Sequence, residues 1–395
     1  MELVLKEEQR LLQDSAKKLV QQFGGTSPYR DSRKKEPGFN KKRLKEIAKA
    51  GWLSLMVPER NGGIGLGVTE LALTLEQAGR GLITEPITAL ASTARAIGFG
   101  QAATGTAEAM KSLLSGSKLI VPVVQDPSAP ELKREKIFAE HYHYGYQLTG
   151  TRKAVPYAKE ADSFLVDANT SDGTIIIIVP RETFGVDVES VNTVDGTTHG
   201  KVTFSEATIM ADDRLVATVK QGESLAADVY DRILLGVSAE ILGVMEQALD
   251  LAVGYLQTRE QFGRPIGSFQ ALQHRAVNDH IQIELLRSLL FQVCSAVDKG
   301  NGNREMVAAV KARASVAVLS VTKSVIQMHG AIGFTDEYDA GLFLRRAMTL
   351  SSQYGNSKFH QQRYAHYTRI EEENQNKPVN KRKKRKRKKS IFASL

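Results

Sequence analysis

Hydrophobic positions in the first third of the chain recur with the spacing of amphipathic helices. The first such face comprises Leu11, Leu12, Ala16, Leu19, Val20 and Phe23. Spacings of three and four residues place side chains on one side of a helix. A glycine-rich stretch at residues 51–67 interrupts this pattern and is expected to be a loop between helices. We therefore predict a helical domain over residues 1–117.

The pattern changes to short β-rich runs between residues 118 and 222. The runs that predict strands are residues 119–124, 164–166, 175–179 and 201–204. Gly, Pro, Asp and Asn residues separate them, which is typical of turns between strands. This region is predicted to form a small β-domain, sheet-like or barrel-like.

Helical spacing returns from residue 223 and continues to about residue 370. One predicted face comprises Ile233, Val237, Ile241, Val244, Ala248, Leu251 and Tyr255. A second comprises Val307, Val310, Ala314, Ala317, Val321, Val325 and Met328. Several long helices joined by short links favour a helical bundle. Residues 371–395 are polar and charged, and we expect them to be disordered.

Composition narrows the class of protein. A chain of 395 residues exceeds the usual size of a single core, and 42% hydrophobic residues are ordinary for a globular protein. No run approaches the roughly 18 apolar residues of a membrane span, and the first residues lack the basic-then-apolar order of a signal peptide. The single cysteine, Cys294, excludes an intramolecular disulfide and a cysteine-cluster metal site. We expect a cytoplasmic protein without a metal, in which Cys294 packs as a small hydrophobe.

The net charge of +9 comes from one segment. Residues 381–389 are nine consecutive Lys and Arg residues, and without them 44 basic residues stand against 44 acidic residues. A run of like charges repels itself and is usually a solvated extension. It could also bind an anionic polymer, but the neutral remainder of the chain does not support a nucleic-acid surface. We therefore expect no nucleic-acid partner.

Two motifs carry the most specific chemistry. Residues 259–274 read REQFGRPIGSFQALQH, a turn rich in hydrogen-bond donors between two amphipathic segments. Residues 327–334 read QMHGAIGF. In this order and at this separation, the two motifs resemble those of the acyl-CoA dehydrogenase family, flavoproteins that desaturate acyl thioesters between Cα and Cβ. The succession of helical, β and helical regions over residues 3 to about 367 is similar to the architecture of that family.

The resemblance implies a fold, a cofactor and partners. The fold would be mainly α with a central β-domain: an N-terminal helical domain, a β-barrel-like middle domain (118–222) and a C-terminal four-helix bundle (223–370). FAD would bridge the β-domain, the bundle and a neighbouring subunit of a homo- or hetero-tetramer. The residues that would contact FAD are Arg259, Gln261, Phe269 and Gln270 from the first motif, and Gln327, Met328, His329, Gly330 and Ala331 from the second. The fixed charge of Arg259 suits a pyrophosphate, although a cation at this position could also cap a helix.

The sequence departs from the family pattern at several positions. Residues 125–130 (QDPSAP) lack most of the motif that commonly enters the β-domain. Ala154 and Pro156 stand where a Trp and a Thr or Ser commonly face the flavin ring. Ala331 replaces a common glycine. We expect these changes to alter how flavin and acyl group fit.

The catalytic base is the sharpest departure. Removal of the α-proton needs a base, commonly a carboxylate poised by burial. Gly355 occupies the position of the Glu of the common branch, and Ile233 that of another branch. Glu240 lies between Val237 and Val244, centrally on an apolar face, where an unpaired carboxylate is costly.

Glu240 is accordingly our first candidate for the base, evenly balanced against a buried structural salt bridge. Asp231, Asp336 and Glu337 are further candidates, although the last two lie in a loop better suited to an interface.

The sequence thus predicts an FAD-dependent acyl-CoA dehydrogenase that passes electrons to an electron-transfer flavoprotein. The alternative is a non-catalytic, FAD-binding partner subunit of a heteromeric acyl-CoA dehydrogenase, which the missing Glu at position 355 favours. A nucleic-acid adaptor acting through residues 381–389 is a third, weaker hypothesis. Acyl chain length, and the choice between a CoA and a carrier-protein thioester, stay open.

Overall fold

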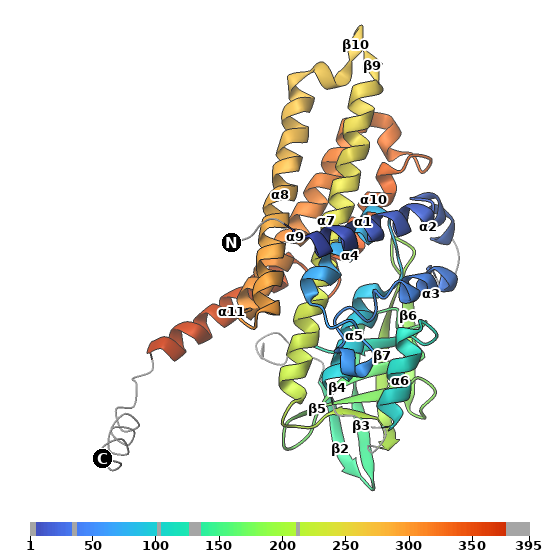
Figure 1. Ribbon diagram of the computed structural model, residues 1–395, viewed down its shortest axis with the longest axis vertical. Helices are drawn as coiled ribbons and strands as arrows, with labels where there is room; N and C mark the ends of the chain where they lie inside the picture. The colour runs from blue at the N-terminus through green and yellow to red at the C-terminus, as the bar shows by residue number, and fades with distance from the viewer. Residues whose placement is uncertain (1–4, 34–37, 101–103, 126–135, 211–213, 377–395) are drawn as a thin grey trace.

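Three groups of elements follow one another along the chain (Figure 1). The computed structural model describes residues 5–33, 38–100, 104–125, 136–210 and 214–376. The first group is helical: α1 (Glu7–Gln22), α2 (Ser27–Ser32), α3 (Lys41–Lys49), η1 (Glu59–Asn61), α4 (Val68–Arg80), α5 (Ile87–Phe99) and α6 (Thr104–Leu114). The glycine-rich stretch forms turns and η1, as its composition predicts.

The second group forms one sheet. Its strands are β1 (Ile120–Val123), β2 (Ile137–Tyr142), β3 (Gly145–Pro156), β4 (Ser163–Asn169), β5 (Thr174–Pro180), β6 (Val186–Asn192), β7 (Thr198–Met210) and β8 (Leu215–Ala217). The strand order is β6-β7-β3-β2-β4-β5-β8, with β1 paired to β4. β1, β4 and β5 are the most buried strands, because their apolar runs suit a sheet interior.

Four of these strands are not evident from hydrophobic runs: β2, β3, β6 and β8. In β2, for example, buried residues alternate with exposed ones over Ile137–Glu140, so only one face is buried. Register shifts also interrupt the pairing of β3 with β7, between Leu148 and Gly150 and between Arg152 and Val155. Such irregularities re-aim side chains, and the second of them lies where the sheet approaches the bundle.

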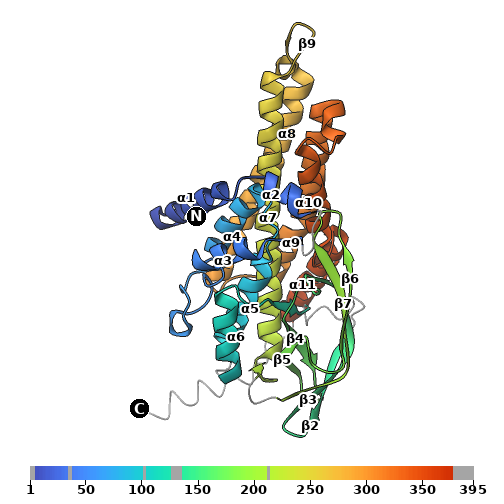
Figure 2. The same cartoon turned by 90° about the vertical axis from the view of Figure 1, so that its right-hand side faces the viewer.

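The third group is the bundle. It comprises α7 (Gly222–Thr258), β9 (Glu260–Gln261), β10 (Arg264–Pro265), η2 (Ile266–Ser268), α8 (Gln270–Asp298), α9 (Arg304–His329), η3 (Gly330–Phe334), α10 (Ala340–Ser352) and α11 (Ser357–Asn376). The β9–β10 hairpin forms the tip of the bundle at the end remote from the sheet (Figures 1 and 2). The observed fold therefore confirms the predicted class, a mainly α protein with a central sheet.

Helix α7 joins the three groups. It contacts α4 and α5 of the first group and β4 and β5 of the sheet. Two glycines let α4 and α7 approach closely. A Cβ on Gly79 would lie 2.1 Å from the carbonyl oxygen of Glu240, and one on Gly243 would lie 1.8 Å from that of Glu76. Any larger residue would force the helices apart, so these glycines fix the position of the α7 segment that carries Glu240.

The boundaries at residues 117/118 and 222/223 stay a proposal; they agree with the end of α6 at Leu114 and the start of α7 at Gly222. The prediction of disorder from residue 371 is wrong for residues 371–376, which continue α11. Glu371–Glu373 are good helix formers, so polarity alone did not end the helix. The basic run 381–389 and the motif departure at residues 126–130 lie outside the described residues.

Within the described ranges, no helix is long and apolar enough to cross a membrane. The same residues contain no group of three or more His, Cys, Asp or Glu side chains that could hold a metal ion.

Candidate functional site

A pocket of about 350 Å³ lies where the sheet meets the end of the bundle. We call it the junction pocket. It is lined by Pro122–Gln125, Arg152–Pro156, His199, Tyr230, Ser352–Gly355 and Phe359. Its volume falls within the roughly 300–1,000 Å³ of small-molecule sites. The pocket thus joins β1, β3, β7 and α7 to the turn between α10 and α11.

Unusual backbone conformations gather at the junction pocket. Ala154 has φ +54° and Tyr354 has φ +56°, although neither is a glycine, and Gly355 has φ +109°. A side chain at positive φ costs of order 1–3 kcal/mol and persists only when the surroundings hold it there. Such strain is typical of functional sites. The two positions that depart from the family pattern on β3, Ala154 and Pro156, therefore lie where a ligand would bind.

The charged groups at the pocket are basic. Arg152 is buried and pairs with Asp167 at 2.8 Å, behind the pocket wall, while Lys153 is exposed. Burial lowers the pKa of His199; Asp195 opposes this shift and Arg346 adds to it. His199 is therefore largely neutral near pH 7. No Asp or Glu is among the described residues that line the pocket.

Gly355 lines the pocket at the position of the missing Glu, and its surroundings exclude a side chain. A Cβ there would lie 2.6 Å from Cδ1 of Phe359 and 2.9 Å from Nε2 of His360. Its φ of +109° is also one that other residues rarely adopt. The turn is therefore built for glycine, and a carboxylate cannot simply be placed there.

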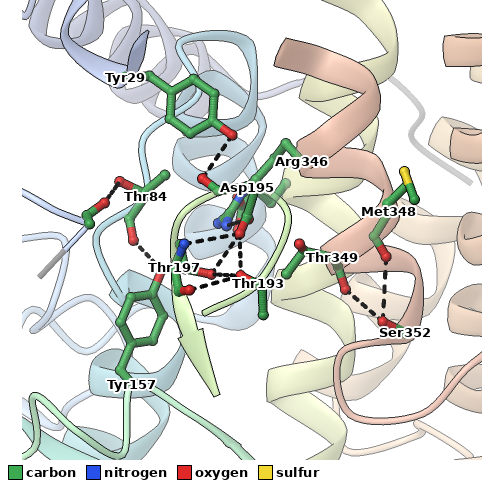
Figure 3. Close-up of polar contacts among 12 residues, drawn as sticks. Tyr29, Thr84, Tyr157, Thr193, Asp195, Thr197, Arg346, Met348, Thr349 and Ser352 are labelled. Atoms are coloured by element: carbon green, nitrogen blue, oxygen red, sulfur yellow. Dashed lines mark hydrogen bonds and ion pairs between the residues drawn. The ribbon is translucent and has the colours of Figure 1, made fainter. Parts of the chain in front are cut away.

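Glu240 lies deep between the elements rather than at the pocket. Its Oε1 accepts hydrogen bonds from Nε and Nη2 of Arg346, at 2.8 and 2.5 Å. Nη1 of Arg346 donates to Asp195 at 2.7 Å. All three side chains are buried. Figure 3 shows Arg346 of α10 reaching the loop between β6 and β7 that carries Asp195, beside Tyr29 of α2.

The two carboxylates of this cluster differ in their pKa. Burial would raise the pKa of Asp195, but Arg346 and the hydrogen bonds from Thr193 and Thr197 hold it below its usual value. For Glu240 burial prevails over Arg346, and its pKa is raised. Raised carboxyl pKa values occur at catalytic sites, but they also occur in buried structural networks. Here Glu240 is held by an arginine and is not among the residues that line the junction pocket. This geometry supports the salt-bridge alternative over the catalytic prediction.

The carboxylates of Asp231 and Asp336 also have structural partners, whereas Glu337 is bound through its backbone carbonyl. Asp231 accepts from Nη2 of Arg363 at 2.5 Å. Asp336 pairs with Arg33 at 2.5 Å, and the Glu337 carbonyl accepts from Arg30 of α2 at 3.1 Å. The loop at residues 336–339 therefore docks on the N-terminal helices of its own chain.

The first flavin motif lies at the tip of the bundle. Arg259, Gln261 and Gln270 are exposed, and Phe269 is half-buried beneath Arg264, whose guanidinium carbon lies 4.3 Å from the ring centroid. The hairpin is at the opposite end of the molecule from the sheet (Figures 1 and 2). These residues therefore lie at the end of the molecule remote from the junction pocket of their own chain.

The second motif ends α9. Gln327 is exposed and lines a groove between α8 and α9 together with Ala271, the neighbour of Gln270. The structure thus brings the two motifs to one surface. Met328 is buried, whereas Gly330, with φ +66°, and Ala331 are exposed in the turn that follows.

His329 of the second motif is a packing residue in this structure. Its Nδ1 lies 2.7 Å from the Val325 carbonyl oxygen, and its ring lies 4.7 Å from that of Tyr255 and 4.8 Å from that of Tyr338. Burial lowers its pKa, against the backbone contacts with Val325 and Leu251. This environment suits a neutral ring and gives it no opening to the junction pocket.

Comparison with known proteins identifies two regions of the chain. Residues 6–116 match the model of the acyl-CoA dehydrogenase N-terminal domain, and residues 230–366 match that of the C-terminal domain. The acyl-CoA dehydrogenase FadE27 of Mycobacterium tuberculosis is 30% identical over 321 residues, covering 78% of this chain and 83% of that protein.

Two solved structures are similar over most of their length. The ChsE4–ChsE5 complex from Mycobacterium tuberculosis matches with a TM-score of 0.83 and 26% identity, covering 96% of this chain and 100% of that chain. A variant of the Tcur3481–Tcur3483 steroid acyl-CoA dehydrogenase matches with a TM-score of 0.83 and 26% identity, covering 92% of this chain and 98% of that chain.

Proposed function

The chain belongs to the acyl-CoA dehydrogenase family, and from this premise we propose that it is a subunit of an FAD-dependent acyl-CoA dehydrogenase. The family consists of oxidoreductases. The proposed reaction removes the Cα proton and the Cβ hydride of an acyl-CoA thioester, and the electrons then pass to an electron-transfer flavoprotein. A cytoplasmic location is part of the proposal, supported by the single, buried Cys294.

The residues fit FAD if one cofactor contacts two subunits. The junction pocket has the size and the mixed polar and apolar wall for a flat ring system. The exposed Arg259 would supply a charge-assisted contact to the pyrophosphate of a neighbouring subunit's cofactor. Gln261, Gln270 and Gln327 would add hydrogen bonds from the same surface. When bound, FAD would accept the hydride; the role of this chain is to hold and orient it.

We further propose that a homologous partner subunit supplies the carboxylate base. The single observation that carries this proposal is that no Asp or Glu is among the described residues lining the junction pocket. The closed surroundings of Gly355 explain why the family's usual position cannot supply one. Two structures similar to this chain, the ChsE4–ChsE5 complex and the Tcur3481–Tcur3483 enzyme, each combine two proteins. The proposal then corresponds to the alternative inferred from the sequence, in which this chain is a non-catalytic, FAD-binding partner subunit of a heteromeric enzyme.

The test is anaerobic flavin bleaching by a series of acyl-CoAs. The full chain would be purified alone and co-expressed with a homologous subunit that has Glu where this chain has Gly355. We expect no bleaching by the chain alone, bleaching by the complex, and electron transfer from the complex to an electron-transfer flavoprotein. Bleaching by the chain alone would show that it has its own base. A complex that holds flavin but is never bleached by any acyl-CoA would refute the proposed activity.

The cofactor assignment has its own test in the same complex. Arg259→Ala removes a charge-assisted contact, commonly about 1.5–3 kcal/mol, so FAD affinity should fall roughly tenfold to a hundredfold. Lys299→Ala is the control, because Lys299 is an exposed cation at the other end of α8 from the hairpin. Equal FAD affinity in Arg259→Ala and in the unmodified complex would remove Arg259 from the site.

A further inference from the structure

Lys311 is a fully buried lysine whose described partners are all uncharged. It lies on α9 with 0% of its surface exposed. Its Nζ lies within hydrogen-bond distance of four oxygens, which share its three N–H donors: Oγ of Ser315 at 2.9 Å and the backbone carbonyl oxygens of Leu350 at 3.2 Å, Ser351 at 3.3 Å and Gly355 at 3.1 Å. No ion pair of Lys311 occurs among the described residues. A buried ammonium without a counter-ion is costly, so its retention calls for a specific role.

The carbonyl groups around Lys311 belong to the end of α10. Leu350 and Ser351 lie in the last turn of that helix, where carbonyl oxygens have no partner within the helix. This end also carries the negative pole of the helix dipole, which favours a cation. The third carbonyl, that of Gly355, lies beyond the helix in the turn to α11. Lys311 therefore connects α9 to both the helix end and the turn.

The same turn is a wall of the junction pocket. Ser352, Gln353, Tyr354 and Gly355 all line it. Tyr354 and Gly355 have positive φ, so contacts from outside must hold the turn in this shape. Besides Lys311, the hydroxyl of Tyr230 donates to the Tyr354 carbonyl at 2.8 Å. Nε2 of His360 also lies 3.1 Å from the Tyr354 carbonyl oxygen, whereas Lys311 binds the carbonyl oxygen of Gly355.

We propose that Lys311 is a positioning residue for the junction pocket, whose buried ammonium fixes the turn at residues 352–355 as the wall for the bound ligand. Its effect on flavin rests on the proposed function, whereas its effect on the turn does not. The ammonium contacts the turn only through carbonyl oxygens, so it acts by orienting backbone and not by touching the ligand. Loss of the Nζ donors should therefore free the turn while the helices around it stay folded.

The test compares Lys311→Met and Lys311→Gln with Ser315→Ala. Met retains the length of the side chain without donors, and Gln retains a neutral donor. Ser315→Ala is the matched control, because it removes one acceptor and leaves the three carbonyl contacts in place. The readout is amide hydrogen exchange of the flavin-free full chain at residues 352–360, set against residues 229–245 of α7 and 164–179 of the sheet.

We expect exchange at residues 352–360 to rise at least about tenfold in Lys311→Met, to rise less in Lys311→Gln, and to stay near wild type in Ser315→Ala. The reference segments should not change. In the complex with the partner subunit, Lys311→Met should also shift the absorbance spectrum of bound FAD and weaken its binding about tenfold.

Unchanged exchange at residues 352–360 in Lys311→Met would overturn the proposal. An equal rise in every segment, or failure of both Lys311 variants to fold, would overturn it as well, because Lys311 would then serve the core as a whole. If no assembly of the wild-type chain binds FAD, the proposed function fails while the exchange result still decides the role of Lys311.

Discussion

Replacement of Glu240 by Gln separates the two roles that the sequence leaves open for this residue. Gln retains the shape of the side chain, and its Oε1 can still accept from Nε and Nη2 of Arg346, which lie 2.8 and 2.5 Å from that atom. The substitution removes the negative charge and any basicity. If Glu240 is a structural partner of Arg346, flavin reduction in the assembled enzyme should continue at the wild-type rate. If Glu240 is the base, flavin reduction should stop.

The expected change in stability is small because two effects oppose each other. Hydrogen bonds to a charged acceptor contribute roughly 1.5–3 kcal/mol and neutral ones roughly 0.5–1.5 kcal/mol, so the pair with Arg346 weakens by about 1 kcal/mol. The variant also avoids burial of a carboxylate, the main cause of the raised pKa of Glu240. Arg346 keeps its ion pair with Asp195 at 2.7 Å. We expect Glu240→Gln to lie within about 1 kcal/mol of wild type near pH 7.

The pH dependence gives this prediction a sign. Because the folded-state pKa of Glu240 is raised above its unfolded value, the folded protein binds the proton more tightly than the unfolded chain does. The stabilisation that proton binding by Glu240 gives to the folded state is fully present below the unfolded pKa and is lost as pH rises through the folded pKa. The variant has no such group. The stability of Glu240→Gln relative to wild type should therefore increase with pH above the unfolded pKa, by up to about 1.4 kcal/mol per pH unit.

Urea denaturation at several pH values, followed by circular dichroism and by the fluorescence of the single Trp52, measures this difference. Glu85→Gln is the matched control, since Glu85 is also buried and accepts from an arginine, Nε of Arg43, at 2.8 Å. A variant that stays folded and keeps its flavin but no longer reduces it would refute the structural role. A stability difference that falls with rising pH would refute the electrostatic argument.

Three further outcomes are expected from the same geometry. Arg346→Met leaves two buried carboxylates without their cation and should lower the free energy of unfolding by about 3–5 kcal/mol. The control Arg33→Met should lower it by less than about 1 kcal/mol, because the partner of Arg33, Asp336, is half exposed. Urea denaturation measures both values. Gly355→Glu should lower the free energy of unfolding by at least about 1–3 kcal/mol because residue 355 has a positive φ, and this loss should appear as a lower Tm. Acyl-CoA should still not bleach the flavin of this variant when the chain is alone. Bleaching would contradict the closed turn. Burial lowers the pKa of Lys311 to about 7, so between that pH and the unfolded pKa the unfolded chain binds more protons than the folded protein. Over this range the stability of wild type relative to Lys311→Met should rise by up to about 1.4 kcal/mol per pH unit. A constant difference would show that the ammonium is not desolvated.

Local patterns were sufficient to predict the order of helices and sheet. Periodic apolar faces located α7 and α9, because a helix that packs against its neighbours in the bundle must present apolar residues at helical spacing. The apolar runs at residues 164–166 and 175–179 located β4 and β5 for the corresponding reason in a buried sheet. The strands β2 and β6, with many exposed residues, lack such a run. Their pairing depends on neighbours distant in sequence.

The candidate site was harder to predict from the sequence, because its contacts join segments far apart in the chain. Glu240 and Arg346 are 106 positions apart, and Asp195 is 151 positions from Arg346. Periodicity showed that Glu240 would be buried, but a buried carboxylate requires a partner or a function, and spacing along one helix cannot choose between them. The junction pocket likewise brings together β3 and the turn after α10, which no local motif connects.

The buried Lys311 shows what the sequence signal could and could not reveal. Lys311 lies four residues after Val307 and three before Ala314, on the apolar face that predicted α9. The same spacing argument that selected Glu240 therefore applies to Lys311, although the sequence analysis did not use it. Burial of both residues follows from helical periodicity, but their partners differ: Glu240 faces a guanidinium, and Lys311 faces the carbonyl groups of a helix end and a turn. A charged residue within an apolar helical face thus marks a place where the fold holds another segment, and only the three-dimensional structure tells whether that segment lines a site.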